Sequence, residues 1–247
     1  MGSEDSVVLA IDAGNTRIKW GVHDAHAWSA SGAIATAESA RFYEALRPQL
    51  PVDAAIASNV AGPGVLADLQ TACDRADIPL TVIRSERQQL GVVNGYRDPQ
   101  QLGSDRWAAL IAAHHVEPGH KLVVNAGTAL TVDALAADGR FLGGLIVAGP
   151  ALMRRALDRG TAGLRLTEGV LSDFPQSTPD AITSGAIQAC AGAIARLGEA
   201  MAARGCPPHR IILSGGAAAE IAPSLPLAST LHENLVLDGL LIIARNS

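Results

Sequence analysis

Aromatic side chains, cysteine and clusters of basic residues are all scarce in this chain of 247 residues. Aromatics make up only 3% of the sequence, so Ala, Val, Leu and Ile must supply most of the apolar core. Such small and branched side chains suit the layers between helices and sheets, and they favour an α/β protein. The formal charge is −5 with no run of Lys or Arg, which argues against nucleic acid as a partner.

The three cysteines, Cys73, Cys190 and Cys206, are far apart and form no C-x-x-C pair, which argues against a disulfide framework and a zinc site. No apolar run approaches the ~20 residues that a membrane helix needs. The run at residues 7–11 is too short for a signal peptide and has no basic flank. We therefore expect a cytoplasmic protein with no membrane partner.

Two common nucleotide-binding motifs are also missing. Neither G-x-x-x-x-G-K-[ST] nor G-x-G-x-x-G occurs anywhere in the chain. Their absence disfavours Walker-type nucleoside triphosphatases and Rossmann dehydrogenases.

The hydrophobic pattern predicts the same order of elements twice. In the first half we expect strands at 7–12, 17–22, 27–32, 54–58 and 80–83, and helices at 39–50 and 65–76. In the second half we expect strands at 121–125, 130–135, 140–147 and 210–213, and helices at 151–159, 179–204 and 235–244. This repetition indicates a duplicated ribonuclease-H-like plan, the actin-like ATPase fold. The predicted α/β domains are residues 1–118 and 119–247, with phosphate-binding turns on either side of an interdomain cleft.

The turn after the first strand, Asp12-Ala13-Gly14-Asn15-Thr16, has the chemistry of a phosphate site. Gly14 would let the backbone approach a phosphate closely, and exposed amides in such a turn bind anions. Lys19 could add positive charge, whereas the Asp12 carboxylate beside a polyphosphate would need a cation such as Mg²⁺ between them. The alternative is an ordinary β-turn, since each of these residues favours one.

A second turn, Asn125-Ala126-Gly127-Thr128, follows the equivalent strand of the second half. Two such turns at equivalent places favour a shared nucleotide site over two unrelated β-turns. Ser214-Gly215-Gly216 is a third candidate, for adenosine or its phosphates, and could equally be a plain strand-to-helix turn.

Residues 96–106 offer candidates for binding an acceptor. Asp105 could accept a proton, or it could simply stabilise the dipole of the helix expected at 107–115. Arg106 could bind a carboxylate with two parallel hydrogen bonds, or lie on a helix surface. Tyr96 could contact a ligand, or be an ordinary core or surface aromatic.

Six motifs together make the chain resemble a known family over essentially its whole length. They are Asp12-Ala-Gly-Asn-Thr-Arg-Ile-Lys19, Tyr96, Gly103-Ser-Asp-Arg106, Asn125-Ala-Gly-Thr128, Gly143-Gly-Leu-Ile-Val-Ala-Gly149 and Ser177-Thr-Pro-Asp-Ala-Ile182. Their order and spacing resemble those of the type III pantothenate kinases, also called the Bvg accessory factor family.

The resemblance implies an actin-like homodimer that transfers the γ-phosphate of ATP to pantothenate, the first step of coenzyme A biosynthesis. It also implies Mg²⁺ or another divalent metal, held at Asp12, and a monovalent cation, K⁺ or NH₄⁺. Asp105 would accept the proton of the attacking alcohol. The residues expected to bind ATP are Asp12, Ala13, Gly14, Asn15, Thr16, Arg17, Ile18, Lys19 and Thr128. Those expected to bind pantothenate are Tyr96, Gly103, Ser104, Asp105, Arg106 and, from the partner subunit, Thr178.

At one position the chain departs from the pattern. Most members of the family carry an aspartate at position 125, associated with the monovalent cation or the metal, where this chain has Asn125. An amide keeps an oxygen ligand but removes a negative charge, which weakens cation attraction.

Two other functions are compatible with parts of the sequence. Another small-molecule kinase of the actin-like superfamily would share the phosphate turns without needing Tyr96 and residues 103–106. A non-catalytic regulatory accessory factor would not need Asp12, Asp105 and Thr128, all of which this chain retains.

Overall fold

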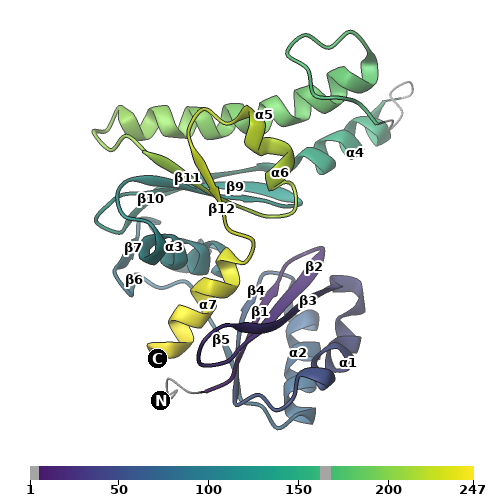
Figure 1. The fold of residues 1–247 in the computed structure, drawn as a ribbon, viewed down its shortest axis with the longest axis vertical. Helices are drawn as coiled ribbons and strands as arrows, with labels where there is room; N and C mark the ends of the chain where they lie inside the picture. The colour runs from purple at the N-terminus through teal and green to yellow at the C-terminus, as the bar shows by residue number, and fades with distance from the viewer. Residues whose placement is uncertain (1–5, 162–167) are drawn as a thin grey trace. The chain divides into compact units, whose positions relative to one another are not determined.

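The computed structural model describes residues 6–161 and 168–247. The chain divides into two compact units, one formed by Met1–Val116 with Asn234–Ser247 and the other by Glu117–Glu233. Each unit contains a mixed sheet covered by helices, as an α/β protein requires (Figure 1).

The first unit is built on a sheet with the strand order β3-β2-β1-β4-β5. The first three strands are antiparallel, and β4 and β5 run parallel to β1. The strands are β1 (Val8–Ala13), β2 (Arg17–His23), β3 (Trp28–Ala35), β4 (Ala54–Asn59) and β5 (Leu80–Val82). The α-helices are α1 (Phe42–Leu46), α2 (Pro63–Arg75), α3 (Ser104–Val116) and α7 (Leu235–Arg245). The 3-10 turns η1 (Thr36–Arg41) and η2 (Arg47–Gln49) flank α1, η3 (Pro99–Gln101) precedes α3, and a small hairpin pairs β6 (Gln88–Gln89) with β7 (Val92–Asn94).

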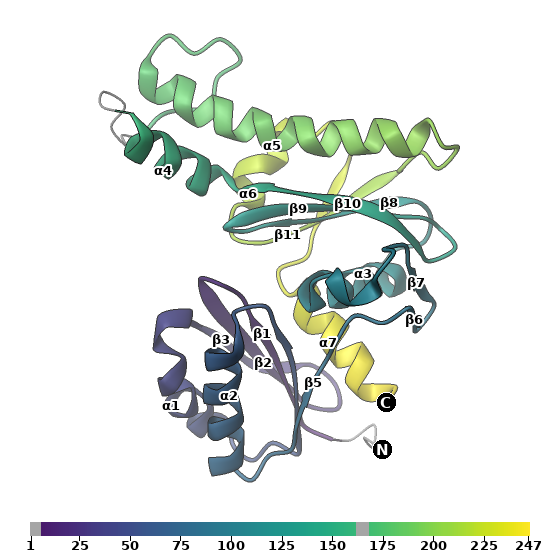
Figure 2. The same cartoon turned by 180° about the vertical axis from the view of Figure 1, so that it is seen from behind.

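Alternation along β1 divides the apolar residues of this unit between the two faces of the sheet. Leu9 and Ile11 pack with Phe42 and Leu46 of α1 and Leu69 of α2. The opposite face of β1 is covered by α7, which also packs along α3 (Figure 2).

The second unit repeats this plan. Its strands follow the order β10-β9-β8-β11-β12, with β8, β9 and β10 antiparallel and β11 and β12 parallel to β8. They are β8 (Lys121–Ala126), β9 (Ala129–Leu135), β10 (Arg140–Ala148), β11 (Arg210–Ser214) and β12 (Ser229–Leu231). The helices are α4 (Pro150–Gly160), α5 (Thr178–Ala202), α6 (Ala218–Ile221) and the 3-10 turn η4 (Ala222–Ser224). Leu122 and Val124 of β8 pack against Cys190 and Ile194 of α5.

The duplication extends to individual hydrogen bonds. The backbone amide of Thr36 donates to the Thr16 carbonyl at 3.1 Å in the first unit. The amide of Gly149 donates to the Thr128 carbonyl at 2.9 Å in the second. In the same way, the amide of Val60 donates to Ala13 at 3.0 Å and that of Ala217 donates to Ala126 at 2.9 Å. The pattern of burial along the strand is also identical in β1 and β8, and in β2 and β9. The predicted repeat therefore describes two structurally equivalent halves.

The predicted domain boundaries differ from the structure at the C-terminus. We expected residues 119–247 to form one domain, but Asn234–Ser247 belongs to the first unit. Apolar residues of α7 such as Leu237 and Leu240 are buried there. Hydrogen bonds also join the helix to the first unit: for example, Trp28 Nε1 donates to Asp238 Oδ1 at 2.9 Å, and an Arg245 nitrogen donates to the Asp24 carbonyl at 2.8 Å.

The other differences concern short elements. The hairpin β6–β7 and strand β12 were not predicted, because two or three residues carry no detectable period. The predicted helix at 39–50 is split into η1, α1 and η2. Within the described residues, no helix has both the length and the apolar character needed to span a membrane.

The packing of α7 on α3 yields a stability prediction. A Cβ at Gly239 would lie 2.0 Å from the Ala108 carbonyl oxygen, a backbone atom that cannot move aside cheaply. We expect Gly239→Ala to lower the free energy of unfolding by about 1–3 kcal/mol, measured by urea denaturation. Gly192→Ala is the control, because a Cβ at this exposed position of α5 meets no atom within 4 Å. It should be neutral or stabilise by up to about 1 kcal/mol. Equal effects of the two substitutions would contradict the packing argument.

Candidate active site

The conformation of the turn between β1 and β2 is fixed by a backbone hydrogen bond within the turn and by the side chain of Thr36. The Gly14 amide donates to the Arg17 carbonyl at 3.0 Å, and Thr36 Oγ1 donates to the Gly14 carbonyl at 2.7 Å. Asn15, Thr16 and Arg17 are consequently exposed at the tip of the turn. The expected nucleotide contacts from Ala13 and Ile18 would have to come from their backbones, since both side chains are fully buried in the core.

Asp12 is the central charged group of this turn. It lies at the end of β1, directly opposite Lys19 of β2 in the antiparallel register. Burial, with a smaller contribution from the negative charge of Asp105, raises the pKa of Asp12 to about 7, while Lys19 acts in the opposite direction. The structure thus brings together Asp12 and Asp105, which are 93 positions apart in the sequence.

Asp105 is placed by the start of α3. Ser104 Oγ shares a hydrogen bond of 2.8 Å with Ser58 Oγ, and Ser58 is the register partner of Asp12 on β4. Asp105 Oδ1 accepts a hydrogen bond of 2.8 Å from the Arg106 amide. Burial raises the pKa of Asp105, and its hydrogen bond and charge interaction with Arg106 partly offset that rise. A carboxylate in this setting is a better base than one in water.

Arg106 is buried, with only 5% of its surface exposed, so the alternative of a helix-surface arginine is excluded. One guanidinium nitrogen, Nη1, donates to the Tyr96 hydroxyl at 3.1 Å. The guanidinium carbon also lies 5.7 Å from the centroid of the Tyr96 ring. Tyr96 and Arg106 therefore form one contact pair beside Asp105.

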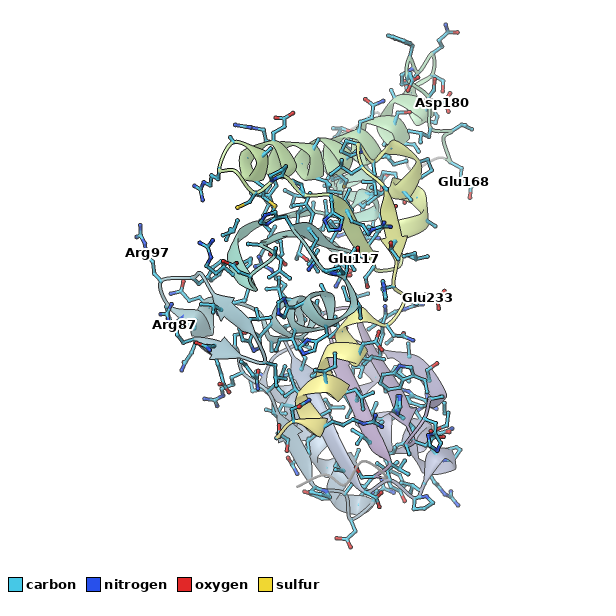
Figure 3. The ribbon with its side chains drawn as sticks, turned by 60° about the vertical axis from the view of Figure 1, so that its left-hand side comes forward. Arg87, Arg97, Glu117, Glu168, Asp180 and Glu233 are labelled. Atoms are coloured by element: carbon cyan, nitrogen blue, oxygen red, sulfur yellow. The ribbon has the colours of Figure 1, made fainter. Side chains whose placement is uncertain are left out.

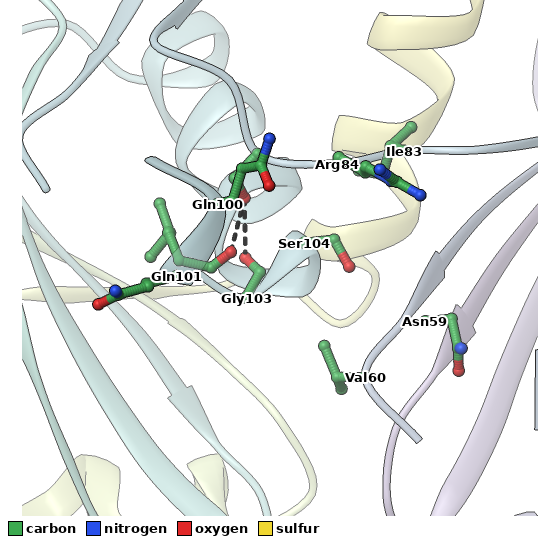
Figure 4. Close-up of a pocket in the computed structure, with 10 residues that line it drawn as sticks. Asn59, Val60, Ile83, Arg84, Gln100, Gln101, Gly103 and Ser104 are labelled. Atoms are coloured by element: carbon green, nitrogen blue, oxygen red, sulfur yellow. Dashed lines mark hydrogen bonds between the residues drawn. The ribbon is translucent and has the colours of Figure 1, made fainter. Parts of the chain in front are cut away.

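A hollow of about 350 Å³ lies beside the same helix start (Figure 4). Its lining includes the predicted residues Gly103 and Ser104 together with Asn59, Arg84 and Ser85. The hollow is of the size that holds a small molecule.

In the second unit, three glycine-containing segments converge at the end of β8. A Cβ at Gly149 would lie 2.1 Å from the Gly127 carbonyl oxygen. Gly215 has a φ of +98°, and a Cβ there would lie 2.6 Å from Asn125 Oδ1. Only glycine allows so close an approach. Thr128 is exposed at the tip of the turn. Of the glycines singled out at 143–149 and 214–216, Gly149 and Gly215 therefore lie against the turn that follows β8.

Thr178 lies at the first turn of α5, where Ser177 caps the helix. Ser177 Oγ donates to Asp180 Oδ2 at 2.6 Å and accepts from the Asp180 amide at 3.3 Å. Thr178 itself is exposed.

The residues present fit a divalent cation at Asp12 better than a monovalent cation at Asn125. Within the described part of the chain, no group of three or more His, Cys, Asp or Glu side chains forms a metal cage. Mg²⁺ commonly takes only one or two carboxylates and completes its shell with phosphate and water, which Asp12 would allow. The neutral amide of Asn125 offers an oxygen but no charge.

Sequence reasoning missed two residues that build this site. Thr36 fixes the first turn from the end of β3, and Ser58 joins the surroundings of Asp12 to those of Asp105. The position of Ser58 next to Asp12 follows only from the pairing of β1 with β4, because Ser58 lies near the end of a buried strand and matches no motif.

Residues 8–200 match the family model described as type III pantothenate kinase. The chain belongs to this family. A type III pantothenate kinase from Nitrosospira multiformis is 43% identical over 241 residues, covering 98% of this chain and 92% of the relative. One from Aromatoleum aromaticum is 44% identical over 239 residues, covering 97% and 98%.

Solved structures agree on the fold. A protein from Campylobacter jejuni, described as a Baf family transcriptional activator, has a TM-score of 0.63 at 20% identity, covering 96% of this chain and 98% of its own. A ROK hexokinase from Thermus thermophilus has a TM-score of 0.51 at 15% identity, covering 98% and 100%. The predicted fold class, that of the actin-like ATPases and sugar kinases, is confirmed.

The raised pKa of Asp12 predicts how stability depends on pH. Its folded pKa of about 7 lies above the ordinary value of 3.8, so the folded state holds this proton more tightly than the unfolded state. This carboxyl therefore makes the ligand-free protein lose stability as pH rises from about 4 to about 7, with no further loss above. Asp12→Asn should raise the free energy of unfolding at pH 8 by about 1–3 kcal/mol and leave it nearly unchanged at pH 4.

Thermal and urea unfolding at pH 4, 6 and 8 without nucleotide or metal would measure this effect. Asp74→Asn, at an exposed position of α2, is the matched control and should shift stability little at any of the three pH values. A loss of stability at pH 8 in Asp12→Asn would contradict the desolvated state of this carboxylate.

Proposed function

We propose that this protein phosphorylates pantothenate with ATP to give 4′-phosphopantothenate, the first step of coenzyme A biosynthesis. The observation that carries the proposal is the arrangement at the start of α3 in a member of this family. There the Asp105 carboxylate lies within electrostatic reach of Asp12 and is followed by the buried Arg106. Asp12 serves the nucleotide, Asp105 the acceptor hydroxyl and Arg106 an acidic group of the acceptor.

The nucleotide-binding groups are proposed in each unit separately. In the first, the exposed tip at residues 15–17 offers backbone amides, and Lys19 offers positive charge, to phosphate oxygens. In the second, Thr128 and the Gly127–Gly149–Gly215 region offer a hydroxyl and closely approachable backbone. Mg²⁺ held at Asp12 would supply charge neutralisation of the phosphates.

The acceptor is proposed to bind around Asp105. Phosphoryl transfer depends mainly on positioning and charge stabilisation, so the base need only take up the proton as the alcohol oxygen attacks phosphorus. The raised pKa of Asp105 suits that role. Arg106 can hold the pantothenate carboxylate, oriented by the Tyr96 hydroxyl. Gly103 and Ser104 would line the bound acceptor.

We further propose a homodimer in which Thr178 reaches the acceptor bound to the partner subunit. The second unit exposes apolar side chains near the start of α5, including Val170 at 73% and Phe174 at 87% of their surface. Ile146 of β10 is 64% exposed. Scattered exposed apolar residues are normal on a monomer, so the proposal relies on Val170 and Phe174, which lie four positions apart in the segment that leads to Thr178. The cytoplasmic location and the absence of nucleic acid and membrane partners stay predictions from the sequence.

The proposed function is tested by Asp105→Asn. We expect the purified wild-type protein to convert pantothenate and ATP to 4′-phosphopantothenate and ADP. In Asp105→Asn, kcat should fall by a factor of about 10²–10⁴, because the amide cannot accept the proton. The melting temperature should not fall, because the variant removes a desolvated carboxylate, and nucleotide affinity should be retained. Asp74→Asn is again the control, at unchanged activity.

Each contrary outcome of this test has a distinct meaning. Turnover of Asp105→Asn at the wild-type rate would contradict the assigned base. A wild-type protein that phosphorylates a sugar but not pantothenate would support the alternative kinase. ATP binding without turnover of any acceptor would support a regulatory role.

Asn125 leads to a separate prediction about the monovalent cation. Because its amide is neutral, we expect K⁺ or NH₄⁺ to stimulate the wild-type protein weakly. Asn125→Asp should restore a charge and lower the K⁺ concentration for half-maximal activity at least about threefold. The measurement is a K⁺ titration against Na⁺ at constant ionic strength. Strong K⁺ dependence of the wild-type protein, unchanged in Asn125→Asp, would show that Asn125 does not limit the site.

A further inference from the structure

The segment between β5 and α3 is built as one braced loop. Ser85 Oγ donates to the Leu102 carbonyl at 2.8 Å and so ties the two ends of the segment together. Gln89 of the hairpin accepts a hydrogen bond of 2.9 Å from Trp107 Nε1 on α3. Trp107 is fully buried, so the hairpin is anchored to a fixed point of the first unit.

The part of the loop that carries Tyr96 leaves the hairpin at Asn94, whose side chain is 1% exposed. Asn94 Oδ1 accepts from the Tyr96 amide at 3.0 Å, and Asn94 Nδ2 donates to the Pro99 carbonyl at 3.2 Å. The Asn94 amide donates to the Arg87 carbonyl at 3.0 Å, which extends the hairpin by one further step.

Arg87 then closes the loop from outside. Its guanidinium donates to the carbonyls of Asn94, Tyr96 and Arg97 at 3.3, 2.9 and 3.0 Å. Figure 3 shows Arg87 and Arg97 on the same side of the first unit. A planar group with several fixed donors can hold three carbonyls at once, which neither a neutral side chain nor an ammonium group can do equally well.

We propose that Arg87 is a positioning residue for the acceptor end of the site. By fixing the backbone on both sides of Tyr96, it sets where the Tyr96 hydroxyl meets Arg106, and so orients the guanidinium that would bind the carboxylate. Arg87 itself need not touch pantothenate. The inference rests on the proposed function, because it assigns the Tyr96–Arg106 pair to that substrate.

Arg87→Ala should raise both the KM for pantothenate and the Kd measured by calorimetry without ATP by about tenfold, the effect of losing a few hydrogen bonds from a charged donor. We expect kcat to stay within about twofold and the KM for ATP to be unchanged, because the groups that serve the nucleotide do not depend on this loop. Arg87→Lys keeps the charge but only part of the hydrogen bonding and should recover part of the affinity.

Arg97→Ala is the matched control. It removes the same charge from the same loop, and among the described residues its side chain makes no hydrogen bond or ion pair. Its KM for pantothenate should stay at the wild-type value. Equal losses in Arg97→Ala and Arg87→Ala, or complete rescue by Arg87→Lys, would show that overall charge matters rather than loop geometry, and would overturn the proposal.

A double-mutant cycle tests whether Arg87 acts through Tyr96. Tyr96→Phe removes the hydroxyl that meets Arg106, so adding Arg87→Ala to it should cause little further loss. Fully additive losses would overturn the proposal. Melting temperatures identify any variant that fails to fold, in which case Arg87→Gln, which keeps an amide donor, replaces Arg87→Ala in the cycle.

Hydrogen exchange separates this proposal from the proposed function. In Arg87→Ala, the amides of residues 94–101 should exchange faster, while those of β1 and β4 should not. A wild-type protein inactive on pantothenate would refute the function, yet the exchange experiment would still test the loop brace. Unchanged exchange together with unchanged pantothenate affinity would refute the role of Arg87.

Discussion

The candidate site of the first unit depends on keeping two carboxylates, Asp12 and Asp105, partly out of water and within reach of each other's charge. Such an arrangement opposes folding, because desolvation and like charge both disfavour the ionised forms. It persists because the surrounding backbone is fixed: β1 is held between β2 and β4, and α3 is joined to β4 by the Ser58–Ser104 hydrogen bond. Lys19 offsets only part of the charge. A site in this state favours a cation, since its positive charge offsets the repulsion between the carboxylates and allows an anionic polyphosphate to bind beside them.

The second unit has the same backbone plan, but its turn has no pair of carboxylates that repel each other. Asn125 occupies the position equivalent to Asp12, and the close approach of Gly215 places its side-chain oxygen against backbone. The two halves therefore share the backbone structure of the turn but differ in the charge of the residue at the end of the strand, Asp12 or Asn125. Duplication supplies two similar backbone turns, and in this chain only the first of them carries an aspartate at the end of its strand. The asymmetry between Asp12 and Asn125 is thus consistent with a divalent metal assigned to the first half alone.

Much of this could be predicted from the sequence, for reasons that are visible in particular elements. The turns at Asp12 and Asn125 stand out because glycine and small polar residues follow short buried strands, and their repetition identifies the duplicated fold. The helix at 235–244 was also predictable, but its place was not. Its apolar residues fit either half, and tertiary contacts such as the Gly239–Ala108 approach and the Trp28–Asp238 hydrogen bond place it in the first unit. The role of Ser58 could not be predicted, because its hydrogen-bond partner, Ser104, is 46 positions away in the sequence. The role of Arg87 could not be predicted either, because it binds backbone carbonyls, which every residue has.

The two halves differ most where the acceptor is proposed to bind. In the second half, three residues separate β12 from α7, whereas in the first the segment from Ile83 to Gly103 lies between β5 and α3. This additional segment contains the hairpin, the Arg87 brace and Tyr96, and it leads directly into Asp105 and Arg106. The duplicated fold does not by itself identify the acceptor, because one fold can host many functions. Since function resides in sites added to a common fold, the acceptor specificity of this chain is best sought in the segment that duplication does not explain.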